Sequence, residues 1–374
     1  MAEPRGVMGA KLYISSATIA STIDSEREFM GLTWNEIGYV SNVSQHGITF
    51  QDVPFTVVGG RVYHLKGAYD YGPVELQMAL DLSDAGQLLL KTAAESVSQD
   101  HYGFRIDKTD APSSVGGPTM VMFRGLAQSF VQQMGDANTV AMVSSRVAIN
   151  GEEIDVDPAE LYDRFTTTGG TLAHYTLFNG TDPEALAPYL ADNVLYLVSG
   201  NANTGLAADG SQLIGDTGYT LSGGALVFQA RIASTLITNL ALFVGFTDQV
   251  AALENPIYSA AVADTITTDA TDAVGFMFDT GMATDNFWLV GVNNNVDETA
   301  QNSAIAPVSN TYVILRVEIA TNGDAVFSID GTVVGTTMTT ACRTTVPLYP
   351  TICVNARSTV SKTVTVDELY VRQG

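Results

Sequence analysis

The sequence predicts a mainly β protein in two parts: a β-sandwich or barrel with one helix, then a jelly-roll β-sandwich. Apolar and polar residues alternate along many short segments, as expected of strands that turn one face to a core. Asn322-Gly323 and Asp330-Gly331 are dipeptides typical of tight hairpin turns. Because a single segment shows clear helical periodicity, we expect little helix outside it.

In the first half, the apolar pattern predicts strands and one helix. The helix is expected over Asp84–Val97, with Ser83 as the N-cap. Segment Ser41–Gly60 is expected as a long loop, and loops of that length usually have a function. The expected strands are Lys11–Ser15, Thr33–Val40, Arg61–Lys66, Val74–Leu82, Tyr102–Ile106, Met120–Gln132 and Thr139–Ile149, and the expected apolar face of the helix is Ala85, Leu88, Leu89, Ala93 and Val97.

The composition changes near residue 150, where an acidic, proline-containing stretch begins. We therefore expect domains over 1–153 and 172–374 joined by a linker over 154–171, with a short helix within Ala159–Phe165. In the second domain, Leu226–Ile232 and Val313–Ile319 alternate as strands do, and the apolar pattern slips by one step at Asp367-Glu368, which indicates a β-bulge.

The charge of the chain excludes a nucleic-acid-binding protein. The net charge is −23, with 10 Lys and Arg against 15 Asp and Glu in residues 1–150, and 7 against 25 in residues 151–374. Such a chain repels nucleic acid, so the balance indicates either plain solubility or a surface that lets DNA pass without sticking. There is no apolar run long enough for a membrane anchor and no secretion signal at the start, so we expect folding in a cytoplasm.

No pattern of catalytic, cofactor-binding or metal-ligating residues stands out, so we expect a protein that is not an enzyme and binds no cofactor. The four histidines have no ligand partner at helical spacing. The run Glu153–Asp157 superficially resembles the carboxylate cluster of glycan hydrolases but lies in the expected linker. Trp288 is a candidate for glycan contact, with a core position as the alternative. Cys342 and Cys353 are either a disulfide or two buried thiols.

The first half resembles the tail tube proteins of long-tailed phages with flexible tails (siphoviruses). No single motif is decisive, but their order and spacing over about residues 8–153 are specific. The motifs are Leu32-Thr-Trp-Asn-Glu-Ile-Gly38, Arg61-Val-Tyr-His-Leu-Lys-Gly-Ala-Tyr-Asp70, Asp81-Leu-Ser-Asp-Ala-Gly-Gln-Leu88, Val121-Met-Phe-Arg-Gly125 and Ile149-Asn-Gly-Glu-Glu153.

This resemblance implies a virion structural protein whose copies form hexameric rings that stack into a DNA-conducting tube. Implied partners are further copies of the chain, the tape measure, tail terminator and distal tail proteins, and genomic DNA that passes without specific binding during ejection. The loop residues implied in ring stacking are Ser41, His46, Ile48, Phe50, Pro54, Phe55 and Gly59. The residues implied on strands of the inner sheet are Val121, Phe123, Arg124, Gln128, Val140, Met142, Ser144 and Arg146.

The second half resembles the concanavalin-like jelly-roll domains of phage structural proteins. The likeness rests on Phe228–Ile232, Val274–Asp279, Phe327–Gly331 and the closing Val366-Asp-Glu-Leu-Tyr-Val-Arg372. It implies an exterior decoration domain with a fold but no assigned ligand. The alternative function, from a different class, is a carbohydrate-binding adhesin that contacts host surface glycans.

Overall fold

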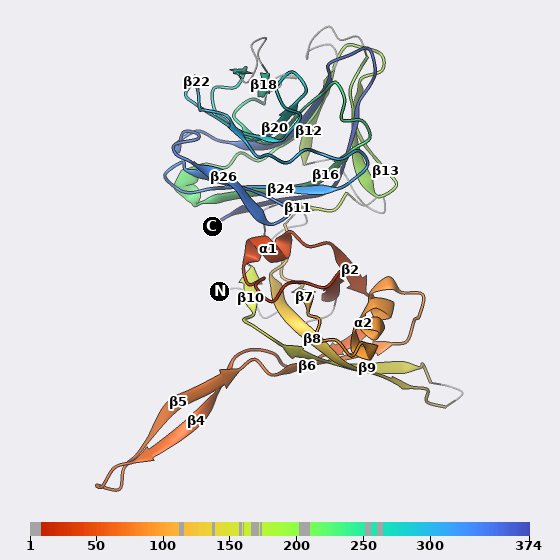
Figure 1. Cartoon of the computed structure of the whole chain (residues 1–374), viewed down its shortest axis with the longest axis vertical. Coiled ribbons are helices and arrows are strands. Elements are labelled where there is room, and N and C mark those ends of the chain that lie inside the picture. Colours follow the sequence, from red (N-terminus) through yellow and green to blue (C-terminus); the bar gives the residue numbers. More distant parts are fainter. Residues whose placement is uncertain are drawn as a thin grey trace. The chain divides into compact units, whose positions relative to one another are not determined.

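A computed structural model describes residues 9–111, 116–136, 139–156, 159, 161–165, 172, 174–201, 210–250, 256–259 and 265–374. The chain forms two compact units, which Figure 1 shows in one view. The N-terminal unit comprises Met1–Asp110 and Pro118–Pro158, and the C-terminal unit comprises Ala111–Gly117 and Ala159–Gly374. The predicted mainly β fold with several antiparallel sheets is confirmed. None of the helices in the described part of the chain has the length and apolar character that a bilayer crossing requires.

The N-terminal unit is built on one eight-stranded antiparallel sheet. Seven strands follow one another in space, and the eighth, β10 (Ile154–Val156), pairs with β8 beside the start of that strand. The seven are β2 (Trp34–Ile37), β1 (Lys11–Ser15), β7 (Tyr102–Asp107), β8 (Met120–Gln133), β9 (Met142–Ile149), β6 (Pro73–Ala79) and β3 (Val40–Val43). The expected single strand Thr33–Val40 is therefore wrong, because Tyr39 adopts φ of 57° and the chain turns there into β3.

Helix α2 (Ala85–Glu95) covers one face of this sheet and closes the core of the unit. The strands contribute alternate apolar residues such as Val74, Phe104 and Val147, and the helix contributes Leu90 and Ala93. A Cβ atom at Gly86 would lie 2.2 Å from the carbonyl oxygen of Glu36, so only glycine allows the helix to approach β2 this closely.

The helix was expected at this place, but its cap was assigned wrongly. Of its expected apolar face, Leu89 and Ala93 pack into the core, whereas Ala85, Leu88 and Val97 are exposed. Asp84, not Ser83, is the N-cap, because its carboxylate accepts the backbone N–H of Gln87. The Gln87 amide is itself buried and donates to the carbonyl oxygens of Gly38 and Ala79. Leu88, the next residue, is 51% exposed.

A second short helix, α1 (Glu26–Met30), was not expected from the sequence. Ser25 and Glu28 form a reciprocal capping box at its start. Arg124 of β8 donates to the carbonyl oxygens of Ser21 and Ile23 just before it. Five residues are too few to show a helical apolar period, so the capping box was the one available signal.

The expected loop Ser41–Gly60 is also wrong, because most of it is strand. After β3, the chain enters β4 (Thr49–Thr56), which pairs with β5 (Val62–Asp70) as a separate two-stranded hairpin. Figure 1 shows this hairpin projecting from the sheet of its own unit. Neither face of the hairpin is buried, so the sequence of β4 carried no core signal, whereas the expected strand Arg61–Lys66 matches part of β5.

The base of the hairpin is anchored to the unit by a histidine and by aromatic rings. His46 Nδ1 lies 3.0 Å from Glu153 Oε1, in a half-buried pair. The rings of Phe50 and Tyr69 lie 5.6 Å apart, and Tyr69 meets Tyr71 edge-on at 6.3 Å. The pKa of His46 is raised above its usual 6.5, chiefly because the bonded Glu153 carboxylate favours the imidazolium, while burial opposes this.

The described part of the expected linker over 154–171 is largely strand. Ile154–Val156 is β10, on β8, and β11 (Leu161–Asp163) pairs with β28 of the C-terminal unit. The helix expected within Ala159–Phe165 is wrong where the chain is described. Leu161–Asp163 forms a strand there, because its backbone pairs with β28. Residues 157–158, 160 and 166–171 lie outside the described residues.

The C-terminal unit is a sandwich of two eight-stranded antiparallel sheets. The first sheet contains β13 (Leu186–Ala191), β14 (Val194–Val198), β28 (Thr363–Gln373), β16 (Leu226–Ser234), β24 (Val313–Ile319), β25 (Ala325–Ile329) and β26 (Thr332–Met338), with β11 on β28. The second contains β12 (Tyr175–Asn179), β15 (Ser211–Gly215), β27 (Tyr349–Ala356), β17 (Leu240–Thr247), β20 (Ala273–Asp279), β21 (Trp288–Asn293) and β22 (Val296–Asp297), with β23 (Gln301–Asn302) on β21.

The main core of this unit lies between the two sheets, and a second apolar cluster covers the outer face of the second sheet. The second cluster contains Phe243, Met277 and Trp288 from the sheet. The small hairpin of β18 (Ile257–Ser259) and β19 (Ile266–Thr268) packs over it. Cys342 and Cys353 are both buried free thiols, and burial raises the pKa of the Cys342 thiol to about 12.

Two local predictions for this unit are confirmed. Asp330-Gly331 forms the two-residue turn between β25 and β26, with φ of 48° and 80° at the two residues. The register between β16 and β28 shifts at Arg231, which leaves Asp367 as the extra residue of a bulge.

We predict that Leu90→Ala will destabilise the protein far more than Leu88→Ala. Leu90 is fully buried against the sheet, so its truncation should lower the free energy of unfolding by about 2–5 kcal/mol. Leu88, two residues earlier in the same helix, should change that free energy by less than about 0.5 kcal/mol. Chemical denaturation followed by circular dichroism measures both, and equal losses would contradict the observed helix face.

We also predict a pH-dependent contribution of the His46–Glu153 pair to stability. Since the pKa of His46 is higher in the folded protein than its unfolded value of 6.5, this contribution is complete below that value and is lost as the pH rises through the raised pKa. The stability difference between the wild type and His46→Gln should therefore shrink as the pH rises from about 6.5 through the raised pKa of His46. His64→Gln, which removes an exposed pair with Asp52, is the matched control. Parallel stability curves for wild type and His46→Gln would refute the prediction.

Candidate assembly surfaces

The β4–β5 hairpin presents an apolar surface to solvent on both of its faces. Every residue of β4 is exposed, and in β5 only Gly67 is partly covered. Phe55, near the tip, is 57% exposed. The large apolar residues exposed on and beside the hairpin are Ile48, Phe50, Val53, Phe55, Val58, Val62, Tyr63, Leu65 and Tyr69. A two-stranded hairpin is marginally stable by itself in water, and an apolar surface of this kind marks an interaction site.

The hairpin is electrically balanced in a strongly acidic chain. Its four permanently charged side chains are Asp52, Asp70, Arg61 and Lys66. Lys66 and Arg61 lie over the rings of Phe50 and Tyr63, at 4.4 Å and 5.6 Å from the ring centroids. These contacts hold the cations over apolar rings, so the hairpin can approach another acidic molecule without net repulsion.

Strand β8 supplies the second surface, a free backbone edge. Residues Met120–Gly125 pair with β7 on one side, whereas residues Gly125–Gln133 pair with β9 on the other. Beyond Gly125, no strand among the described residues covers the edge that β7 leaves. Val131 on this free part is 52% exposed. The far end of the sheet, β3, offers a different edge, because it pairs with β6 alone.

The face of β6, β8 and β9 that points away from α2 is polar and nearly neutral. Arg146 of β9 lies 3.7 Å from the Glu75 carboxylate of β6, so the two charges compensate each other. The other polar side chains on this face are the uncharged Gln77, Ser129, Gln133 and Ser144 and the cation Arg124, which donates to the carbonyl oxygens of Ser21 and Ile23. A surface of this kind has little net attraction for phosphate groups.

The residues that the sequence analysis singled out divide between surface and core. Ile48, Phe50, Pro54, Phe55 and Gly59 lie on the exposed hairpin or its turn, whereas Ser41 lies earlier, on β3, and His46 at the hairpin base. On the expected inner strands, Gln128 and Arg146 are exposed, Val140 is exposed just before β9, and Arg124, Met142 and Ser144 are partly covered. Val121 and Phe123 point into the core beneath α2.

The described residues that were weighed as catalytic or glycan-binding candidates make ordinary structural contacts. Glu153 is bonded to His46, Asp155 lies 3.6 Å from Lys108, and Asp157 is outside the described residues. Trp288 is buried and donates its indole N–H to the carbonyl oxygen of Thr284, so the core position is the observed one. The described residues hold no cluster of side chains suited to a metal ion.

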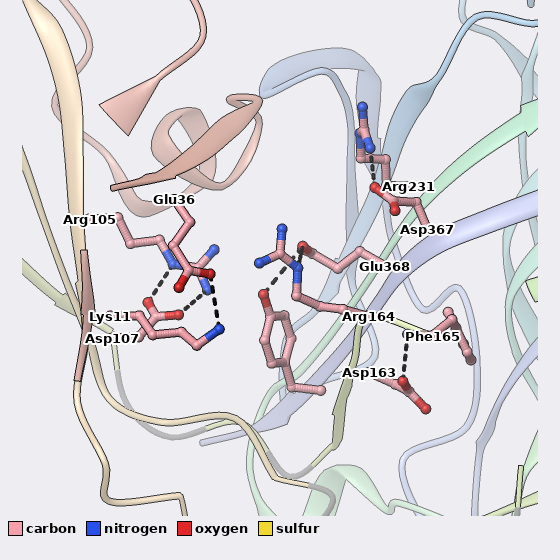
Figure 2. A network of polar contacts seen from close by, with 11 residues as sticks. Lys11, Glu36, Arg105, Asp107, Asp163, Arg164, Phe165, Arg231, Asp367 and Glu368 are labelled. Atoms are coloured by element: carbon pink, nitrogen blue, oxygen red, sulfur yellow. Dashed lines mark hydrogen bonds and ion pairs between the residues drawn. The ribbon is translucent and has the colours of Figure 1, made fainter. Parts of the chain in front are cut away.

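Other charged side chains in each unit are also paired, as Figure 2 shows. In the N-terminal unit, the buried Arg105 guanidinium makes two hydrogen bonds to Asp107 and lies over the Tyr13 ring. In the C-terminal unit, Arg231 pairs with the bulge residue Asp367. These contacts stabilise each unit and provide no free catalytic group.

The chain matches no family model and no curated protein sequence. Parts of it are similar to solved structures of two kinds. The first kind includes the carbohydrate recognition domain of Emp47p (10% identity, 56% of this chain, 93% of that chain, TM-score 0.41) and the laminarinase from Rhodothermus marinus (11%, 58%, 97%, 0.41). The second includes a chain from the sheath/tube terminator structure of an extracellular contractile injection system, PVC (12%, 41%, 98%, 0.31).

Proposed function

We propose that this chain is a structural subunit of a phage tail tube, whose copies form rings that stack into a DNA conduit. The observation that carries the proposal is the β4–β5 hairpin, an apolar arm that its own unit leaves uncovered. Burial of such an arm is favourable by roughly 25 cal/mol for each Å² of apolar surface removed from water. A second copy in the next ring is the occupant, since the arm is the charge-balanced part of a chain with a net charge of −23.

Two different free edges in one subunit support ring formation. The free part of β8 and the edge strand β3 lie at separate positions in one sheet, so they cannot pair with each other within a subunit. Each is left to pair with a neighbouring copy. Contact between unlike edges of neighbouring copies is head-to-tail, and such contacts generate closed rings when the rotation closes. Pairing also satisfies the exposed backbone groups that otherwise invite aggregation. The ring size, six, comes from the family resemblance.

The lining of the ring follows from the polar face of the same sheet. If β6, β8 and β9 surround the channel with the face opposite α2 inward, DNA meets neutral amides, hydroxyls, the compensated Glu75–Arg146 pair and Arg124, which is bonded to two backbone carbonyl oxygens. Helix α2 then lies outside the channel wall. The C-terminal unit is the exterior decoration in this proposal, because it carries most of the negative charge and contributes no strand to the sheet of the N-terminal unit.

We predict that two surface substitutions will interrupt assembly at different stages. Val131→Lys places a charge at the free β8 edge and should leave single subunits, because edge lysines oppose strand pairing. Phe55→Asp places a charge on the hairpin arm and should leave rings that do not stack. Electron microscopy of the purified full chain, with sedimentation to count copies, distinguishes subunits, rings and tubes.

The matched controls are Val97→Lys and Val97→Asp, at a fully exposed position beyond α2. Both should assemble as the wild type does, and all variants should unfold at similar denaturant concentrations. A wild-type protein that stays monomeric at high concentration, even with a tail initiator present, would contradict the proposal. Tubes formed equally well by Val131→Lys and Phe55→Asp would show that these surfaces are not the assembly contacts.

A further inference from the structure

The β4–β5 hairpin leaves the sheet of the N-terminal unit at one end of the strands, and the opposite end is exposed. The hairpin is inserted between Val43, which ends β3, and Pro73, which begins β6. Because β3 and β6 are antiparallel neighbours, both connections to the hairpin lie at the same end. At the other end, Ala79 of β6 stands opposite Met142 of β9. The seven residues of β6 separate the two ends by about 20 Å, at about 3.4 Å a residue.

Five large apolar side chains are exposed at the end away from the hairpin. Figure 1 shows the β8–β9 end of the sheet and the hairpin on opposite sides of this unit. The exposed fractions of the five side chains lie between 48% and 69%. We call them the apolar rim, and they are Tyr39 just before β3, Leu82 between β6 and α2, Leu88 in α2, Met134 just after β8 and Val140 shortly before β9. A group of this kind marks an interaction surface.

Hydrogen bonds hold the segments of the rim together. The buried Gln87 amide joins the start of α2, and with it Leu88, to the backbone beside Tyr39. The backbone N–H of Leu80 donates to the carbonyl oxygen of Ala141, which ties the segment before β9 to the end of β6. Since these contacts lie within one subunit, the rim is formed before any partner arrives and loses little conformational entropy on binding.

Acidic side chains lie among the residues of the rim. Asp81 precedes Leu82 and accepts two hydrogen bonds from Ser83, and Asp84 caps α2. Asp136 lies in the connection from β8 to β9, between the two rim residues of that segment. Lys91, farther along α2, is paired with an acid of its own helix. An apolar surface with acids beside it favours a partner that has an apolar face and a positive charge.

The outer part of the hairpin, residues 53–65, has both of these properties. It contains Arg61 and no acidic residue. Its large side chains on one face form two directly opposed pairs, because positions two residues apart on a strand point the same way. The pairs are Val53 with Leu65 and Phe55 with Tyr63, and all four side chains are exposed.

We propose that the outer part of the hairpin docks on the apolar rim of a second copy of this chain, in the next ring. This inference rests on the proposed function, because head-to-tail stacking brings the hairpin end of one subunit to the rim end of the next. Burial of the two apolar surfaces supplies the free energy, and Arg61 near the rim carboxylates selects the approach. The C-terminal unit of another copy is a poorer occupant, since residues 151–374 carry 25 acidic against 7 basic side chains.

The first test changes the rim and leaves the hairpin intact. Leu82→Asp and Met134→Asp each place a charge on the apolar rim and should leave rings that do not stack, as seen by electron microscopy and sedimentation of the full chain. Arg61→Glu, on the hairpin, should raise the protein concentration at which tubes form by at least about tenfold. Val97→Asp, exposed beyond the other end of α2, should stack as the wild type does. Thermal unfolding checks that every variant is folded.

The second test links the two surfaces covalently without adding charge. Tyr63→Cys and Met134→Cys in one chain place a thiol on the hairpin and another on the rim, while Cys342 and Cys353 are buried. A bis-maleimide added to tubes should give products longer than the number of copies in one ring, because the links run from ring to ring. Tyr63→Cys combined with Val97→Cys should give no such series.

The outcomes separate this inference from the tube proposal. Normal tubes from both Leu82→Asp and Met134→Asp overturn the inference and leave the tube proposal standing. Cross-linked products that stop at the number of copies in one ring also overturn it, because they place the hairpin on a neighbour in the same ring. A wild type that forms neither rings nor tubes contradicts the tube proposal itself, and the inference with it.

Discussion

The N-terminal unit depends on the antiparallel pairing of one long strand, β8. Its first half is paired on both sides, by β7 and by β9 or β10, and its inward side chains meet α2. Its second half runs past β7 and is paired on one side only. One strand therefore fixes the core and, with no interruption in its backbone, extends out of it. The core determines where the free edge points, because a slip in register would turn the buried residues outward.

The sequence was most informative where local chemistry and burial agree. The alternation in β16 and β24 and the turn at Asp330-Gly331 all have short-range causes, and all are found in the structure. The bulge was visible because one extra residue, Asp367, breaks a strict period of two on a buried strand. In these cases a few neighbouring residues decide the backbone conformation.

The sequence was misleading where distant contacts decide. Leu88 and Leu90 have the same helix propensity, and contacts with distant parts of the chain, among them the buried Gln87 amide and the close approach of Gly86 to β2, accompany the face on which Leu90 is buried. Strand β4 has no buried face, so apolar periodicity could not distinguish it from a loop, although part of its partner β5 was expected as a strand.

The two buried thiols have a practical consequence for chemistry on this protein. Cys342 and Cys353 are the only cysteines in the chain, and both are covered by apolar neighbours that disfavour the thiolate, the form that reacts with alkylating agents. The two native thiols of the folded chain therefore react very little with maleimide reagents at neutral pH. A single cysteine introduced at a surface position becomes the one addressable point, where a fluorophore or cross-linker can be attached with no background from the native sequence.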